Sequence, residues 1–308
     1  MSNNTKESIA IVWFKRDLRI HDHFPLTSAA NLQEQGIKVL PLYVVEPEYW
    51  QLPDSSARHW RFISQSLIEL NRALTQLGQG LVLRQDNIIK VLEKLASQFN
   101  IVGLYSHQES GNLWTYQRDK DVAIWCLINK IKWHEDEVFG VFRRFTDRDY
   151  WSHYWEKYMA RKKAVAPISL TKIVSLDDSF ELPDLDLELL EKDEINHIQM
   201  GGRSQALYCF ESFLKERGKQ YSYGMSSPLT AFTSCSRLSP HITFGTISLR
   251  EIVQKLRKHL KKPELNTTWK KSLRSFDSRL HWHCHFMQKL ETEALFETHN
   301  MLQIFNGL

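Results

Sequence analysis

The residues best suited to chemistry form a hydroxyl-rich turn in the last third of the chain. Ser234, Ser236 and Ser239 cluster immediately before Pro240, a residue type that commonly occupies the first turn of a helix. Hydroxyls and free backbone N–H groups at a helix start bind anions, and Arg237 adds a fixed positive charge. The spacing suits a pyrophosphate, although an ordinary serine-capped helix start would carry the same hydroxyls.

A second cluster lies on a predicted helix at 269–290. His281 and His285 are four residues apart and so share a helical face, with Cys284 beside them. These residue types ligate zinc, but a closed site needs two more ligands, and no recognisable spacing supplies them. The pattern therefore favours a histidine-rich helix that borders a cofactor or a phosphate backbone over a metal site.

The elements that must position these groups begin with an α/β domain at 8–135. Apolar runs of strand length lie at 9–14, 38–45, 81–83, 102–106 and 131–134. Helical patterns fill the intervals at 25–35, 55–77, 87–99 and 112–129. Because parallel neighbouring strands need helical crossovers, this alternation predicts an α/β doubly wound five-stranded parallel sheet.

The remaining chain divides into a connector and a helical part. Residues 136–195 look irregular and acidic, and 183–194 resembles a solvated linker. Residues 196–308 form a partial all-α domain, with helical patterns at 203–217, 247–260 and 269–290.

Several function classes are excluded by what the sequence lacks. The turn after the first strand, KRDLRIHDHFP, holds no glycine, and GxxxxGK[ST] occurs nowhere, which argues against a glycine-rich NAD site and a P-loop. The four cysteines form no CxxC pair, which favours reduced thiols in a cytoplasmic protein. No signal peptide and no apolar run of membrane-spanning length is present, so no membrane association is expected.

The charge of the chain is unevenly distributed. Residues 196–308 carry 16 Lys+Arg against 8 Asp+Glu, whereas 136–195 carry 9 against 14. A basic helical part suits a polyanionic partner such as nucleic acid. Lysine-rich solvated helix faces would produce the same excess.

Four stretches together resemble the photolyase/cryptochrome family. The most specific is SRLSPHITFG (236–245), within the longer matching stretch 201–252. The others are VWFKRDLRIHDH (12–23), FGVFRRFTDRDYW (139–151) and SFDSRLHWHCHFMQKLE (275–291). The resemblance implies an antenna-type α/β domain followed by a helical FAD-binding domain.

The resemblance also implies which residues hold the cofactor. The positions that bind FAD in the family correspond here to Tyr223, Cys235, Ser236, Arg237, Leu238 and Ser239. Cys235 stands where a Thr or Ser is usual, and because a thiol is a weak donor, we expect weaker phosphate binding there. No catalytic side chain is assigned, since the chemistry of the family belongs to the flavin.

The helix at 275–291 matches the family element that lines the flavin and faces the DNA lesion. Its matching positions are Phe276, Arg279, Trp282 and His283, where many repair enzymes have Trp, Glu, Trp and Arg. Arg279 replaces the Glu that would hydrogen-bond pyrimidine carbonyls. Recognition of cyclobutane dimers is therefore in question.

A second, antenna chromophore is compatible with the resemblance, but the sequence leaves its identity open. Residues 106–122 resemble the region where some members bind a folate, yet Trp114 and Thr115 stand where Asn and Glu are usual. Glu109 and Asn112 offer substitutes. The alternative is that Glu109 is a surface carboxylate and Asn112 a helix cap.

The implied function is light-dependent DNA repair of the deoxyribodipyrimidine photolyase type, a carbon–carbon lyase that acts on DNA containing pyrimidine dimers. The alternatives are a cryptochrome-type blue-light sensor without repair activity and an inactive small-molecule-binding fragment. Family members continue beyond the position of Leu308, so the chain is expected to be truncated within the FAD-binding domain. Uncovered apolar faces on helices 203–217 and 269–290, and a separately encoded C-terminal half as partner, would follow.

Overall fold

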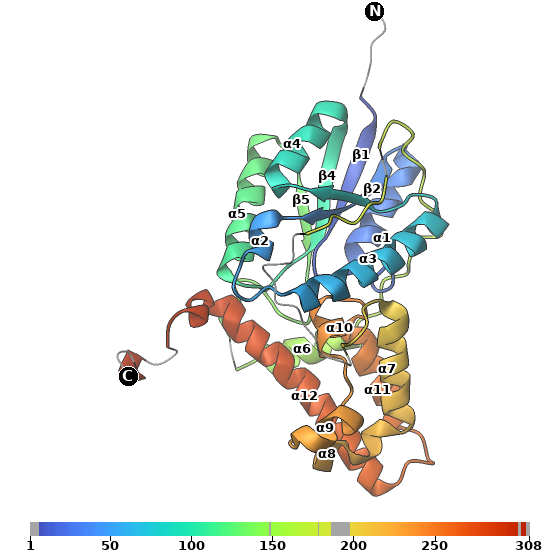
Figure 1. Cartoon of the computed structure of the whole chain (residues 1–308), viewed down its shortest axis with the longest axis vertical. Coiled ribbons are helices and arrows are strands. Elements are labelled where there is room, and N and C mark those ends of the chain that lie inside the picture. Colours follow the sequence, from blue (N-terminus) through green and yellow to red (C-terminus); the bar gives the residue numbers. More distant parts are fainter. Residues whose placement is uncertain (1–5, 148, 178, 186–197, 301–302, 306–308) are drawn as a thin grey trace, which may run out of the picture.

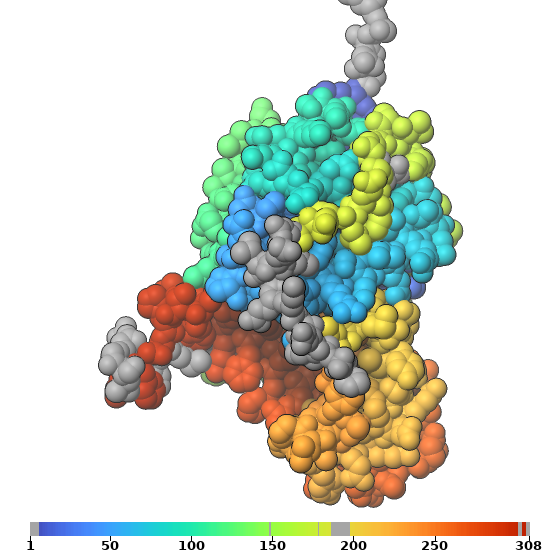
Figure 2. Space-filling view, in the orientation of Figure 1, coloured from blue at the N-terminus to red at the C-terminus, as the bar shows by residue number. Residues whose placement is uncertain are grey.

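The computed structural model describes residues 6–147, 149–177, 179–185, 198–300 and 303–305. An α/β domain and a helical body lie end to end, and one long helix, α12 (Thr267–Thr292), runs from the far end of the helical body to the edge of the α/β domain (Figure 1). The space-filling view shows the same red segment emerging beside the α/β domain (Figure 2).

The α/β domain is built on the predicted sheet. Its five strands are all parallel, in the order β3-β2-β1-β4-β5. They are β1 (Ser8–Phe14), β2 (Lys38–Val45), β3 (Val82–Gln85), β4 (Asn100–His107) and β5 (Trp133–Asp136). The predicted fold class is confirmed, with strand ends displaced by a few residues except at β2.

Helices cover both faces of the sheet, as buried parallel strands require (Figure 1). They are α1 (Phe24–Ala30), α2 (Pro47–Trp50), α3 (Ala57–Leu77), α4 (Ile88–Gln98) and α5 (Leu113–Ile128), with a 3₁₀ turn at Asn31–Gln35. Alternate β1 residues serve different cores: Val12 packs with α1 and α3, and Ile11 packs with α4 and α5. Ser56 caps α3, and Gly78, with φ +115°, ends it.

The connector, residues 136–195, was predicted to be irregular, but part of it is helical in the structure. Trp151–Ala160 forms helix α6, because Trp151, Trp155 and Tyr158 recur at helical spacing and are buried in the helical body. The following residues return to the α/β domain, where Leu170 and Ile173 join its two cores. Residues 180–185 also pack there, and the rest of the predicted linker, 186–194, lies outside the described residues.

The helical body packs around one apolar core that includes Trp155, Phe210, Phe213 and Phe276. Its helices are α7 (Arg203–Lys215), α8 (Tyr221–Gly224), α9 (Pro228–Ser234), α10 (Ser239–Thr243), α11 (Leu249–Leu260) and α12. Short 3₁₀ turns lie at Arg217–Gln220, Ala294–Glu297 and Gln303–Phe305. None of the helices in the described ranges has both the length and the apolar character needed to cross a membrane.

The glycine-free turn after β1 connects the α/β domain to the helical body by hydrogen bonds. Arg19 Nη1 donates to the carbonyl oxygen of Gly245 at 2.9 Å, and the Leu18 amide donates to that of Phe244 at 3.1 Å. The Ser248 hydroxyl, which caps α11, donates to the Asp22 carboxylate. The polar residues of the turn after β1 are therefore hydrogen-bonded to the segment that follows the serine-rich turn.

Candidate functional site

The serine-rich turn is stabilised by hydrogen bonds from Arg217 to its backbone carbonyls. Its guanidinium donates to the carbonyl oxygens of Cys235 and Ser236, the latter at 3.2 Å, and to that of Cys209 on α7 at 2.7 Å. The planar fork of an arginine can bind several oxygens at once. Sequence reasoning treated Arg217 only as a helix end, and no local pattern marks its role.

The backbone of the serine-rich turn has a residue in the left-handed region near its centre. Arg237 adopts φ +62°, in the left-handed region, and its carbonyl accepts from the Gln199 side chain at 2.6 Å. Within the described ranges, the amides of Ser236, Arg237 and Ser239 have no hydrogen-bond acceptor. Three unpaired amides in a partly exposed turn are the donors that an anion requires.

The side chains of the turn differ in their availability. Ser239 is exposed, whereas the Leu238 side chain is buried in the helical core, so that Leu238 offers only its backbone. The Ser236 hydroxyl accepts from the Leu238 amide at 3.3 Å. Burial raises the pKa of the Cys235 thiol, which keeps it protonated and a weak donor. Arg237 lies 4.5 Å from the centre of the Phe232 ring, with no carboxylate in ion-pairing range within the described ranges.

The predicted flavin-facing residues of α12 divide between two environments. Arg279 and Trp282 are exposed, with the guanidinium 5.9 Å from the indole centre. Phe276 is instead a core residue, with its ring centre 4.6 Å from that of Phe213. His283 is turned toward Phe139 and the α/β domain, at 5.6 Å between ring centres. Of the predicted residues, only Arg279 and Trp282 are therefore exposed. The helical periodicity directs Phe276 and His283 toward the interior.

Tyr221, on α8, lies near both Cys235 of the serine-rich turn and Arg279 of α12. Burial raises the pKa of Tyr221, the Cys235 thiol raises it further, and the positive charge of Arg279 lowers it. Tyr223, on the same short helix, is 65% exposed. Helix α8 thus lies between part of the predicted cofactor turn and the exposed Arg279.

Large apolar side chains are exposed on helices α8, α9 and α12, which pack side by side (Figure 1). Those more than half exposed are Tyr223, Leu229, Phe232, Trp282 and Phe286. On α7, Tyr208 is 70% exposed. The predicted exposure on helices 203–217 and 269–290 is confirmed, and patches of this kind mark binding surfaces.

The histidines of α12 pack among aromatic rings. His281 lies 4.8 Å from Trp151 and 4.7 Å from Trp155 between ring centres, and its Nε2 contacts the Ser152 hydroxyl. Cys284 is fully buried, and burial raises the pKa of its thiol to about 12. Within the described ranges, His281, Cys284 and His285 do not come close enough together to form a group of three potential metal ligands.

A group of potential metal ligands does occur at the end of β1, where Asp17 meets His23 and His107. The partner histidines lower the pKa of the buried Asp17 well below its usual range despite desolvation, so its carboxylate only accepts hydrogen bonds. His23 Nε2 and His107 Nδ1 must therefore donate to it, at 2.8 and 2.7 Å. His23 Nδ1 already accepts the Leu26 amide and cannot carry the proton that metal binding at Nε2 would move there. The arrangement is a hydrogen-bonded cluster.

In the predicted antenna region, charged side chains of the protein pair with one another. Glu109 is buried, not a surface carboxylate, because it pairs with Arg16 at 3.1 Å and with Arg118 at 2.6 Å. Asn112 caps α5 by accepting the Thr115 amide at 3.0 Å, as its alternative assignment predicted. Arg118 also lies 5.7 Å from the Trp114 ring centre. Glu109 and Asn112 therefore already have structural partners.

Comparisons of sequence show that the chain is similar to photolyases and cryptochromes. Residues 10–138 match the model of the DNA photolyase family. A cryptochrome DASH from Gloeobacter violaceus is 28% identical over 269 residues, which cover 79% of this chain and 52% of the relative. The chain spans about half the length of several relatives that it matches.

Solved structures share the fold. A Synechocystis sp. PCC6803 cryptochrome superposes with a TM-score of 0.76 at 21% identity, covering 94% of this chain and 62% of the other. A class III photolyase from Agrobacterium tumefaciens also gives 0.76, at 20% identity, covering 100% and 64%. The similarity includes the helical body as well as the sheet.

Proposed function

Because its sequence and fold are similar to those of the photolyase/cryptochrome family, we propose that the chain is a flavoprotein of the deoxyribodipyrimidine photolyase type. The FAD cofactor, when bound, supplies the light-driven electron transfer that splits pyrimidine dimers in DNA. The protein's own part is to hold the cofactor and to orient the damaged bases.

The observation that carries this proposal is the anion-binding chemistry of the serine-rich turn. Three of its amides have no acceptor within the described ranges, and the Arg237 guanidinium has no carboxylate partner there. Together with the exposed Ser239 hydroxyl, they match the oxygens of a diphosphate. Arg217 fixes the carbonyls on the opposite side of the turn, so the amides are preorganised. Tyr223 would border the same cofactor.

On α12, Arg279 and Trp282 would contact the nucleic acid. An exposed indole offers a stacking surface for an extruded base, and a neighbouring guanidinium attracts phosphate. The excess of positive charge in residues 196–308 acts in the same direction. A separately encoded helical chain is a further partner, proposed from the exposed aromatic side chains of α8, α9 and α12.

A cryptochrome-type light sensor is the second candidate, and Arg279 is the residue that favours it. In place of the family's Glu, which hydrogen-bonds pyrimidine carbonyls, Arg279 offers a longer side chain with a permanent positive charge, so the contact to the bases is not reproduced in the same form. A second chromophore in the antenna domain also belongs to this proposal, although Glu109 and Asn112 have other partners.

The test begins with the purified chain and added FAD. We expect flavin absorbance to remain with the protein after gel filtration, and Arg237→Ala to weaken FAD binding about tenfold or more. Arg274→Ala, at an exposed position on α12, is the control and should leave binding unchanged. Failure of the wild-type chain to retain FAD, with or without a helical partner, would overturn the flavoprotein assignment.

Repair and sensing are separated in a second step. The flavin-loaded protein is illuminated with blue light in the presence of oligothymidylate containing pyrimidine dimers, with a dark sample as control. Light-dependent loss of dimers supports the lyase. Intact dimers beside a light-induced change in the flavin spectrum would favour the sensor.

A further inference from the structure

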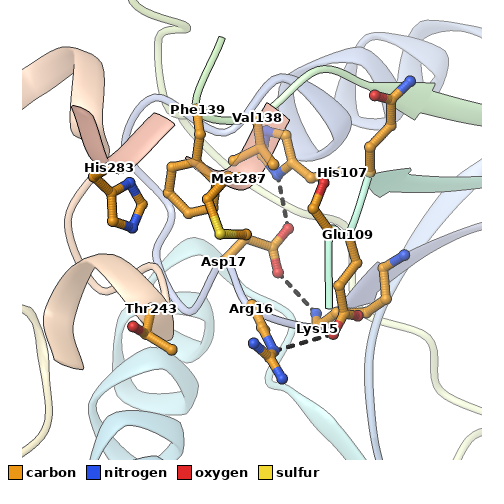
Figure 3. Close-up of a pocket in the computed structure, with 12 residues that line it drawn as sticks. Lys15, Arg16, Asp17, His107, Glu109, Val138, Phe139, Thr243, His283 and Met287 are labelled. Carbon is orange, nitrogen blue, oxygen red and sulfur yellow. Dashed lines mark hydrogen bonds and ion pairs between the residues drawn. The ribbon is translucent and has the colours of Figure 1, made fainter. Parts of the chain in front are cut away.

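A cavity lies where the α/β domain meets α12 (Figure 3). Its volume is about 110 Å³. Polar side chains from the end of β1 and from the segment after β4 form one wall, and apolar side chains form the other. The lining includes Asp17, His107, Val138, Phe139, His283 and Met287.

The charged groups of this cavity already have partners. Lys15 pairs with Asp119 at 2.9 Å, and Arg16 pairs with Glu109 at 3.1 Å. The Asp17 carboxylate accepts hydrogen bonds from its two histidine partners and from the Lys15 amide, the last at 2.8 Å. Within the described ranges no charged side chain of this wall is left without a partner, so the cavity favours a neutral ligand.

One hydrogen-bond acceptor remains. Because His107 Nδ1 donates to Asp17, Nε2 carries a lone pair. No residue in the described ranges donates to this nitrogen, and the His107 side chain lines the cavity. Burial holds the pKa of His107 down to about 3, so the imidazole stays neutral at physiological pH. A ligand that donates one hydrogen bond would satisfy Nε2.

The opposite wall suits a ring. Val138, Phe139 and Met287 supply apolar surface, and the His283 ring stands nearly perpendicular to Phe139, at 75°. Burial lowers the pKa of His283, so this wall too is uncharged near neutral pH. Aromatic edges and a thioether both make favourable contacts with an aromatic ligand.

The size of the cavity limits the ligand to one ring, since a cavity of about 150 Å³ accommodates benzene. We propose that this cavity binds a neutral, single-ring aromatic or heteroaromatic molecule whose one O–H or N–H group donates to His107 Nε2. The ligand would lie between the α/β domain and the inward face of α12, apart from the residues proposed to bind FAD.

The test compares phenol with fluorobenzene, which has a similar size but no donor. The readout is the ¹³C methyl resonance of Met287, assigned with Met287→Leu among the six methionines of the chain. We expect both probes to shift this resonance, and phenol to bind about fivefold more tightly because of its hydrogen bond. If neither probe shifts it, or if the two bind equally, the proposal fails.

Two variants locate the interaction. In His107→Asn the side-chain amide can still donate to Asp17, but the position of Nε2 is lost, so phenol should bind no better than fluorobenzene. Val138→Phe fills the cavity and should abolish binding of both probes. Unchanged phenol preference in His107→Asn, or unchanged binding in a folded Val138→Phe protein, would refute the assigned site.

Discussion

Arg19 and Gly245 lie 226 residues apart in the chain, yet the guanidinium of the first donates to the carbonyl oxygen of the second at 2.9 Å. Gly245 follows helix α10, which begins in the serine-rich turn. The turn after β1 therefore supports the segment that directly follows α10.

Gly245→Ala should destabilise this junction. Gly245 has φ +65°, and an added Cβ would lie 2.2 Å from the carbonyl oxygen of Arg16. We expect the free energy of unfolding to fall by about 2–4 kcal/mol in urea denaturation. Gly36→Ala is the control, since Gly36 has φ +76° but open space around it, and should cost about 1 kcal/mol. Equal losses would show that backbone conformation alone, not close approach, requires Gly245.

Arg217→Lys should weaken FAD binding without removing the positive charge. A lysine ammonium cannot reproduce the fork that joins the carbonyl oxygens of Cys235, Ser236 and Cys209. The serine-rich turn would then lose its preorganisation. Titration with FAD should show about tenfold lower affinity, while Arg274→Lys, at an exposed position, leaves affinity unchanged. Wild-type affinity in Arg217→Lys would refute the supporting role.

Stability should fall on acidification through His107. Burial holds its pKa down to about 3 in the folded protein, against an ordinary value of 6.5 for histidine, so the unfolded chain binds the extra proton first. This contribution is present above pH 6.5 and is lost as pH falls toward 3, at up to about 1.4 kcal/mol per pH unit. In His107→Asn, the slope of the unfolding free energy against pH between pH 6 and 4 should fall by the contribution of about one proton, or about 1.4 kcal/mol per pH unit. An unchanged slope would contradict the assignment.

Replacement by alanine should destabilise the protein strongly at Phe276 and only slightly at Trp282. Phe276 packs against Phe213 and Tyr221, so Phe276→Ala should lower the free energy of unfolding by about 3–5 kcal/mol. Trp282 is half exposed, and Trp282→Ala should change stability by about 0.5 kcal/mol or less. Chemical denaturation of both variants provides the measurement. A large loss in Trp282→Ala would mean that this side chain is structural.

The sheet could be predicted because its signals are local. The apolar run of β2 and the capping residues Ser56 and Gly78 determine their elements without help from distant residues. Helix α6 was missed because its buried tryptophans lie in an acidic, aromatic segment that resembles a connector. The burial of Glu109 could not be foreseen, since its partners Arg16 and Arg118 come from other elements. The division of α12 into an exposed and an inward face likewise depends on what packs against it.

Arg279 provides the sharpest test of the nucleic-acid surface. If its guanidinium contacts phosphate, Arg279→Ala should weaken binding of oligothymidylate severalfold and lower the slope of log affinity against log salt by about 0.7–0.9. Lys258→Ala is the control, because Lys258 is also exposed but lies near the end of α11. Fluorescence anisotropy at several salt concentrations measures both slopes. Loss of affinity without a change in slope would indicate a contact to bases, and equal effects of the two variants would indicate diffuse electrostatic attraction without a specific site at Arg279.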